Sequence, residues 1–191
     1  MQIRKENPYE KCPIYETKQL VFRIVQEEDA EDLLECYSDV FSAKFFNNDN
    51  CTSNFIYQSL DEMKNCIRCW LDEYEKQCFI RFSIVDKKIK KAIGTIEFFP
   101  KHETFKDFGK VGVLRIDLAS KYEKEGLITE ILNMVEGNFY DCFEVESIIT
   151  KAIPEAKQRI IALKNSDYQE LNNNTIVSFD YYYIRVKREL L

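Results

Sequence analysis

Residues 111–139 read VGVLRIDLASKYEKEGLITEILNMVEGNF, and this stretch decides the fold class. Val111–Leu118 is an apolar run of strand length that contains several β-branched residues. From Gly126 onward, apolar residues recur at helical spacing, at Leu127, Ile128, Ile131, Leu132, Val135 and Phe139. A strand that leads into an amphipathic helix predicts a sheet covered by helices, which is an α/β architecture.

The same two patterns continue on both sides of this stretch. Further strands are expected at Leu20–Val25, Cys78–Val85, Ala92–Phe99, Val145–Ile153 and Thr175–Arg188. Further helices are expected within residues 26–37, from about residue 60 to about Lys76, and from Pro154 onward. Lys87–Lys91 is expected to be a hairpin turn and Pro100–Gly109 a polar loop. The predicted order is β-α-α-β-β-β-α-β-α-β, in one domain of residues 1–191 with a polar leader over residues 1–18.

Composition and charge exclude several classes of protein. The chain has 191 residues, of which 45% are hydrophobic, and only 5 Gly and 4 Pro, which is typical of a folded domain rather than a disordered one. No apolar run approaches the roughly 18 residues of a membrane span, and the N-terminus lacks the apolar core of a signal peptide. The net charge is −6, without a basic stripe. We therefore expect a cytoplasmic protein that binds neither membranes nor nucleic acid.

Seven cysteines raise the question of a metal or redox site. An odd number of cysteines without a secretion signal is typical of reduced thiols in the cytosol. Cys66 and Cys69 form a Cys-x-x-Cys pair, but this pair lies in the middle of an expected helix. A zinc site would need two more ligands, and His102, in the expected loop, is the only histidine. We expect no metal.

Four segments, taken in order, carry a resemblance to a known family. They are LVFRIVQEEDAEDLLECYSDV from residue 20, AIGTIEFF from residue 92, LASKYEKEGLITEIL from residue 118 and PEAKQRIIALKNSDY from residue 154. Together they resemble the GNAT superfamily of N-acetyltransferases, in the branch that includes the ribosomal-protein N-terminal acetyltransferases. The third segment matches the family signature at Leu118, Tyr122, Gly126, Thr129, Glu130 and Leu132.

This resemblance implies a fold and a cofactor. The fold is a mixed, mostly antiparallel sheet of about 6–7 strands flanked by about 4 helices. The acyl donor is acetyl-CoA, whose pantetheine arm would add like a short strand along the backbone of Ile116–Leu118. Its pyrophosphate would meet amide N–H groups of the loop and helix start at Glu123, Lys124, Gly126, Leu127 and Ile128, with Ala156 at the start of the next helix.

The chain departs from the family pattern in this loop. The family normally has Arg or Gln at the first position and Gly or Ala at the last, where this chain has Glu123 and Ile128. In the following helix, Ala156 and Arg159 replace the usual Asn and Ser, and the tyrosine that many members use as general acid would fall near Leu163. An alternative interpretation is therefore a non-catalytic GNAT-fold protein that binds a ligand or partner without efficient CoA binding.

Two carboxylates inside apolar strands are candidates for a general base. Glu97 and Asp117 are charges that burial makes costly unless they are paired or functional. Alternation places Arg115 on the same face as Asp117, so a buried ion pair of Arg115 with Glu97 or Asp117 is the alternative. In the last expected strand, Tyr181 and Tyr183 would share one face, where they would line the acceptor side or simply pack.

The sequence therefore predicts an acetyltransferase that moves an acetyl group directly from acetyl-CoA to a primary amine. The acceptor is expected to be a protein N-terminus or a small-molecule amine, and the acidic balance favours a cationic one. A homodimer formed through the C-terminal strand is a further expectation.

Overall fold

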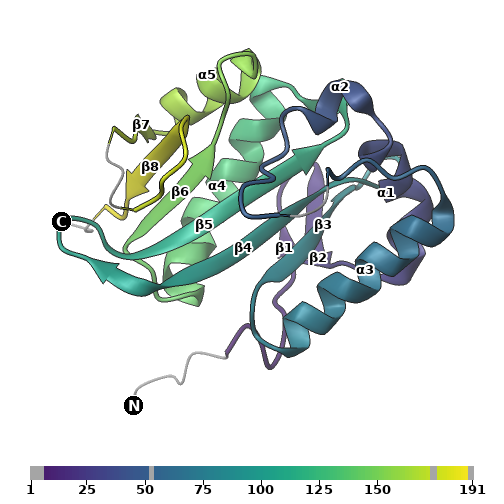
Figure 1. The fold of residues 1–191 in the computed structure, drawn as a ribbon, viewed down its shortest axis with the longest axis horizontal. Coiled ribbons are helices and arrows are strands. Elements are labelled where there is room, and N and C mark those ends of the chain that lie inside the picture. Colours follow the sequence, from purple (N-terminus) through teal and green to yellow (C-terminus); the bar gives the residue numbers. More distant parts are fainter. Residues whose placement is uncertain (1–6, 52–53, 173–175, 189–191) are drawn as a thin grey trace.

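One sheet of eight strands runs through the centre of the molecule, with helices on both faces (Figure 1). The computed structural model describes residues 7–51, 54–172 and 176–188. The strands are β1 Tyr15–Glu16, β2 Leu20–Ile24, β3 Ile80–Asp86, β4 Lys91–Phe105, β5 Gly109–Leu118, β6 Ser147–Lys151, β7 Gln169–Glu170 and β8 Tyr182–Val186. The helices are α1 Ala30–Tyr37, α2 Val40–Ala43, α3 Leu60–Glu75, α4 Glu125–Cys142 and α5 Lys157–Asn165.

The sheet is mixed and mostly antiparallel, as the resemblance implied. Its strand order is β1-β2-β3-β4-β5-β6-β8-β7, and β5–β6 is the parallel pair. The described structure has more strands and helices than the expected 6–7 and 4, because it includes very short elements. These are β1 and β7, with 2 residues each, and α2, with 4 residues. Elements this short have no periodic pattern, so their neighbours in space decide their structure.

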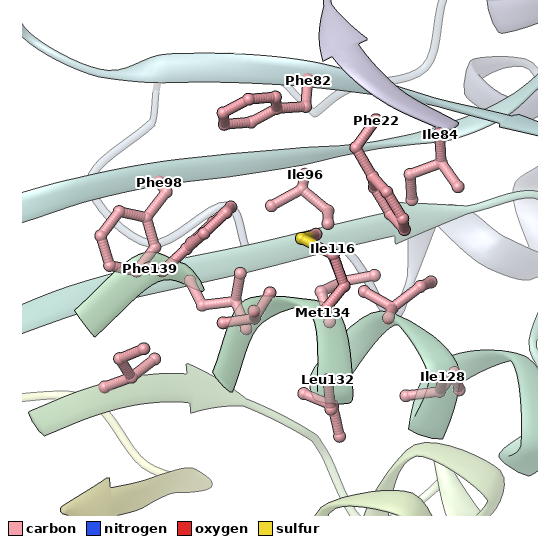
Figure 2. Packing of buried hydrophobic residues seen from close by; sticks show 14 of the residues in the cluster. Phe22, Phe82, Ile84, Ile96, Phe98, Ile116, Ile128, Leu132, Met134 and Phe139 are labelled. Atoms are coloured by element: carbon pink, nitrogen blue, oxygen red, sulfur yellow. The ribbon is translucent and has the colours of Figure 1, made fainter. Parts of the chain in front are cut away.

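Helix α4 packs across one face of the sheet and forms the larger core. Phe22, Phe82, Ile96, Phe98 and Ile116 come from four strands, and they form one buried cluster with residues of the helix that include Ile128, Leu132, Met134 and Phe139 (Figure 2). Each fully buried side chain of this size contributes roughly 1.5–3 kcal/mol to folding. Ala162 and Leu163 of α5 belong to the same core, so α4 and α5 cover the same face.

Helices α1 and α3 cover the opposite face. Their contacts are made by Leu33 and Tyr37 of α1 and by Met63, Ile67 and Trp70 of α3, all buried. The start of α3 is fixed by a capping box, in which Ser59 accepts from the Glu62 amide and Glu62 accepts from the Ser59 amide. The expected helix to about Lys76 is confirmed, and so is the Lys87–Lys91 hairpin turn between β3 and β4.

The expectation of a polar loop at Pro100–Gly109 is wrong. Strand β4 continues to Phe105, and its register against β5 shifts between Pro100 and Thr104. Beyond this shift, Thr104 pairs with Lys110 and Phe105 pairs with Gly109, whose φ is +65°. Proline removes one ladder hydrogen bond and is tolerated at such an irregularity. The polar side chains misled the prediction because several of them, His102 included, are exposed on the extended hairpin.

Two boundaries near the C-terminus also differ from expectation. Strand β8 begins only at Tyr182, because Tyr181 adopts a φ of +67° and leaves the extended region, so Tyr181 and Tyr183 do not share a strand face. Thr175 lies outside the described residues. Helix α5 begins at Lys157 rather than at Pro154.

Part of the expected polar leader over residues 1–18 belongs to the sheet, because Tyr15–Glu16 forms β1. Residues before Asn7 are not described.

No helix in the described ranges is both long and apolar enough to cross a membrane.

Candidate active site

The parallel strands β5 and β6 separate before β5 ends. Their pairing runs from Val111–Ser147 to Leu114–Thr150 and then stops, whereas β5 stays paired with β4 as far as Leu118. Within the described chain, residues 115–118 therefore present their β6-side backbone to an opening in the sheet. An unpaired strand edge of this kind can accept a short extended ligand through main-chain hydrogen bonds.

The start of α4 faces the same end of β5. Among the described residues, the amide groups of Gly126 and Leu127 have no hydrogen-bond partner, while the Ile128 amide donates to the Lys124 carbonyl oxygen at 3.0 Å. Unpaired amides and the helix dipole favour an anion at a helix N-terminus. Gly126 is exposed, and a Cβ built on it would meet nothing within 4 Å. Space and donors for an anion therefore coincide at Gly126.

The other predicted cofactor residues have mixed surroundings. The side chains of Ile116, Leu118 and Ile128 are buried in the α4 core, so only their backbone could meet a ligand. Ala156 is buried at the N-cap of α5, where its amide donates to the Ile153 carbonyl oxygen at 2.9 Å. Lys124, by contrast, is exposed at the N-cap of α4 and adds a positive charge beside the free amides.

Both acids of the loop turn toward α5. Glu123 accepts two hydrogen bonds from Arg159, Nε to Oε1 and Nη2 to Oε2, each of 2.8 Å. Glu125 accepts one from Asn165 at 2.9 Å, and its amide donates to the side chain of Gln158 at 3.2 Å. The two carboxylates are therefore engaged and do not point freely at the anion site.

Glu97 lies in a row of charges across three strands. The register places Arg81 of β3, Glu97 of β4 and Arg115 of β5 side by side. Glu97 bonds Arg81 through Oε2 and Arg115 through Oε1, the latter at 2.8 Å. The Arg115–Glu97 ion pair, an alternative that the sequence left open, is thus present.

Asp117 lies two residues beyond Arg115 in β5, opposite Thr95 of β4, and its carboxylate has different hydrogen-bond partners. Its Oδ2 accepts from Tyr37 at 2.8 Å and from Arg81 at 3.0 Å, and Arg81 also donates to Thr95 at 3.0 Å. Its Oδ1 is buried without a hydrogen-bond partner among the described residues. Burial would lower the pKa of Arg81, but Glu97, Tyr37 and Asp117 raise it overall, so Arg81 stays charged.

The surroundings of Asp117 are dry. Burial, reinforced by the charge of Asp117, raises the pKa of Tyr37 well above its ordinary value, and the same two causes raise the pKa of Cys36. Charged Arg81 also lies 4.2 Å from the centre of the Trp70 ring, a cation–π contact. A carboxylate held in such low-dielectric surroundings interacts strongly with any charge brought near it.

A small cavity adjoins Arg115 on the α1 side of the sheet. Its volume is about 180 Å³, and its lining includes Lys101, Arg115 and Tyr182. The Tyr182 hydroxyl donates to Asp49 at 3.1 Å and accepts from Asn47 at 2.9 Å, which joins the loop after α2 to β8. Burial raises the pKa of Tyr182 to about 12, so its hydroxyl stays protonated at neutral pH.

The cysteines do not form a metal-binding cluster among the described residues. All seven are described and all are free thiols. Cys66 and Cys69 lie inside α3, as expected, and the Cys66 thiol contacts the Tyr57 hydroxyl at 3.0 Å. Burial raises the pKa of Cys66 to about 11, which keeps it protonated and unreactive at neutral pH.

Sequence reasoning missed three residues of this region. Arg81 carries the same signal that singled out Glu97, a charge inside an apolar strand, and could have been found. Tyr37 falls at the end of the helix expected within residues 26–37, and Arg159 stands out in the sequence only as a departure from the family pattern. The Tyr37 hydroxyl contacts Asp117, which is 80 positions away in the chain, and the Arg159 guanidinium contacts Glu123, which is 36 positions away.

Comparison with known proteins identifies the family. A family described as "Acetyltransferase (GNAT) domain" matches residues 19–165. An uncharacterized N-acetyltransferase, YoaA of Bacillus subtilis, is 28% identical over 86 residues, and the match spans 45% of either chain, less than half the length of that relative.

Solved structures share the fold over nearly the whole chain. A GNAT-family acetyltransferase from Bacillus anthracis has a TM-score of 0.68 at 15% identity and covers 93% of this chain and 100% of its own. A ribosomal-protein-S5-alanine acetyltransferase from Vibrio fischeri has a TM-score of 0.66 at 15% identity, with 92% and 97% covered. The ribosomal L7/L12 acetyltransferase RimL, solved with coenzyme A, has a TM-score of 0.68 at 10% identity, with 91% and 98% covered. With a family match over residues 19–165, which is most of its length, this chain belongs to the GNAT acetyltransferase family.

Proposed function

We propose that the protein transfers an acetyl group from acetyl-CoA to a primary amine, either a protein N-terminus or a small-molecule amine. The observation that carries the proposal is the opening between β5 and β6, which ends at the free amides of α4. A ligand with an extended amide-containing arm and a phosphate group fits these two features together. Acetyl-CoA has both.

The residues at the opening fit this donor. The backbone from Ile116 to Leu118 would hold the arm, and the amides of Gly126 and Leu127 with the Lys124 side chain would hold the pyrophosphate. Acetyl-CoA supplies the activated thioester, so the protein has to align it and accept a proton. RimL and the microcin self-immunity protein MccE have been solved with coenzyme A and acetyl-CoA, respectively, which supports the same donor here.

Asp117 is the better of the two candidate bases. Both oxygens of Glu97 are held by arginines, whereas Oδ1 of Asp117 is free to accept a proton from an amine or a water. Its position in β5 places it at the edge that opens toward β6. Glu97 would then act by holding Arg81 and Arg115 in place.

The cavity beside Arg115 is the candidate acceptor site. It lies on the same face as Asp117, and its described lining contains two cations and no carboxylate. Because Glu97 already neutralises Arg115, Lys101 is the lining charge that could meet an anionic or neutral group near the amine of the acceptor.

Release of free coenzyme A thiol, measured with a panel of amines, tests the proposal. The panel should contain N-terminal peptides of ribosomal proteins and small primary amines, with and without a carboxylate. We expect release with at least one acceptor and its loss in Gly126→Glu, which adds charge and bulk at the anion site. Gly137→Glu is the matched control, because Gly137 lies in the same helix and also has open space around it.

Equal loss of release in both glycine variants would contradict the assigned pyrophosphate site. Absence of release with every acceptor would favour the alternative of a non-catalytic binding protein.

A further inference from the structure

A buried ion pair spans the region between the end of β5 and α5. Glu123 and Arg159 share two parallel hydrogen bonds, and their side chains are 7% and 2% exposed. Paired bonds between a guanidinium and a carboxylate are among the stronger polar contacts in proteins. We refer to these two residues as the Glu123–Arg159 clasp.

The third contact of Arg159 shows where its guanidinium lies. Arg159 comes from α5, whose Leu163 packs in the α4 core, yet its Nη1 donates to the Phe45 carbonyl oxygen at 3.1 Å. The neighbouring residue Phe46 packs against Tyr37 in the core of the opposite face, with ring centres 5.2 Å apart. The Arg159 side chain therefore reaches from α5 past the end of β5, because Glu123 follows that strand and Phe45 follows α2.

The charge of the clasp is also felt on the far side of the sheet. Burial raises the pKa of the Cys36 thiol of α1, Asp117 and Glu123 reinforce this rise, and Arg159 opposes it. Nearer the surface, the Glu125 contacts with Gln158 and Asn165 tie the start of α4 to α5.

We infer that the Glu123–Arg159 clasp closes the acyl-donor cleft in the free protein and that acetyl-CoA enters only when the clasp opens. The inference rests on the proposed function, because it assigns the cleft to acetyl-CoA. A ligand that runs from the backbone of residues 115–118 to the amides of Gly126 and Leu127 passes between the loop of residues 119–124 and the start of α5, which the clasp joins. The donor and the closed clasp exclude each other.

The closed state has a clear energetic basis. Separating a buried ion pair leaves two desolvated charges, which is strongly unfavourable unless each finds a new partner. A ligand that binds only the open state has its affinity reduced by the fraction of molecules that are open. The clasp therefore sets the acetyl-CoA concentration at which the enzyme becomes loaded.

Calorimetric titration of the full-length chain with acetyl-CoA tests the inference. Arg159→Ser removes the blocking side chain, and the double variant Glu123→Gln, Arg159→Ser also removes the carboxylate that would remain unpaired. The matched control is Arg185→Ser with Glu136→Gln, which breaks a second ion pair, of 2.7 Å, between β8 and α4. Thermal unfolding followed by circular dichroism verifies that each variant is folded.

We expect the dissociation constant to fall about tenfold or more in the double variant, to fall less in Arg159→Ser, which leaves the Glu123 carboxylate beside the anion site, and to stay at the wild-type value in the control. Binding by the clasp variants alone, with a silent wild type, supports the inference further. An unchanged or weaker affinity in the folded double variant, with wild-type binding intact, overturns the clasp and leaves the proposed function standing. A complete lack of binding in wild type, clasp variants and control overturns both.

Discussion

Asp117 and Glu97 are chemically alike and adjacent in the sheet, yet their surroundings differ at a single oxygen atom. Each carboxylate helps to neutralise Arg81, so removal of either leaves a buried guanidinium with less compensation. Only Asp117 keeps an oxygen without a hydrogen-bond partner in the described structure. The two residues therefore form a natural pair for separating a catalytic role from a structural one.

Asp117→Asn and Glu97→Gln should lower stability by similar amounts, about 3 kcal/mol each, because each removes one partner of a buried ion pair. If Asp117 accepts the proton, Asp117→Asn should in addition lower kcat by roughly a hundredfold or more, while the dissociation constant for acetyl-CoA stays unchanged. Chemical denaturation and steady-state kinetics give the two readouts. Equal losses of kcat in the two variants would exclude a special role for Asp117.

For single residues, the sequence indicated which carboxylates lie inside apolar strands but not which residues they contact. Glu97 and Asp117 stood out because they interrupt apolar strands, and both are indeed buried. Arg159 occurs in Lys-Gln-Arg, which is typical of the solvent face of a helix, yet its side chain is buried. Its partners Glu123 and Phe45 are distant in the chain, so local pattern carries no information about this contact.

The contact between β4 and β5 is the element that holds the open edge in position. Gly94 pairs with Leu118, and a methyl group on Gly94 would meet the Asp117 carbonyl oxygen and lie 3.0 Å from the Leu118 Cα atom. This backbone cannot move away without shifting the end of β5. The glycine permits a close approach of the two strands at the end of the β5 edge that we propose for the cofactor.

Gly94→Ala should therefore lower the free energy of unfolding by about 1–3 kcal/mol through steric strain. Gly137→Ala should instead raise it by up to about 1 kcal/mol, because Gly137 is exposed in α4 and alanine favours helix. Urea denaturation of both variants measures the difference. A Gly94→Ala protein as stable as the wild type would mean that the strands are not packed as closely as described.

Helix α4 is also tied to the turn between β1 and β2. Glu130 accepts hydrogen bonds from the Thr17 hydroxyl and from the amide and side chain of Gln19. Burial acts to raise the pKa of Glu130, but these hydrogen bonds outweigh it and the pKa is lowered overall. A carboxyl with a lowered folded-state pKa stabilises the fold above its unfolded pKa of about 4.3, and this contribution disappears as the pH falls through the lower folded value.

Glu130→Gln should accordingly melt at a lower temperature than the wild type at pH 7. The gap between the two melting temperatures should narrow as the pH drops below about 4, since the wild-type carboxyl then loses its charge. Thermal unfolding at a series of pH values provides the comparison. A gap that does not depend on pH would show that the charge of Glu130 is unimportant.

Long elements with a regular apolar pattern were predicted well, and short or polar ones were not. Helix α4 and strands β3 and β5 lie close to their expected positions because their patterns reflect burial against a large core. The end of β4 was missed because its exposed side chains carry no burial pattern. The opening between β5 and β6 depends on where pairing stops, a tertiary property that strand propensity does not encode.

The whole molecule presents two chemically different approaches to one opening. The α4–α5 side offers free amides and Lys124, and the α1–α3 side offers Asp117 and the cavity beside Arg115. The proposed direct transfer between two substrates requires that both approaches meet at the β5–β6 opening. The cytoplasmic location and the homodimer remain predictions. Light scattering during size-exclusion chromatography would decide the latter.

The most direct test of the account is a calorimetric titration of the wild-type protein with acetyl-CoA, with desulfo-CoA as a control. The account predicts one site with a dissociation constant between about 1 μM and 1 mM, a common range for enzyme substrates. Binding should be lost in Gly126→Glu and retained in Gly137→Glu. No binding at millimolar acetyl-CoA by the wild type and the clasp variants alike, or binding that Gly126→Glu leaves intact, would contradict the assignment of the β5–β6 opening and the α4 N-terminus to the acyl donor.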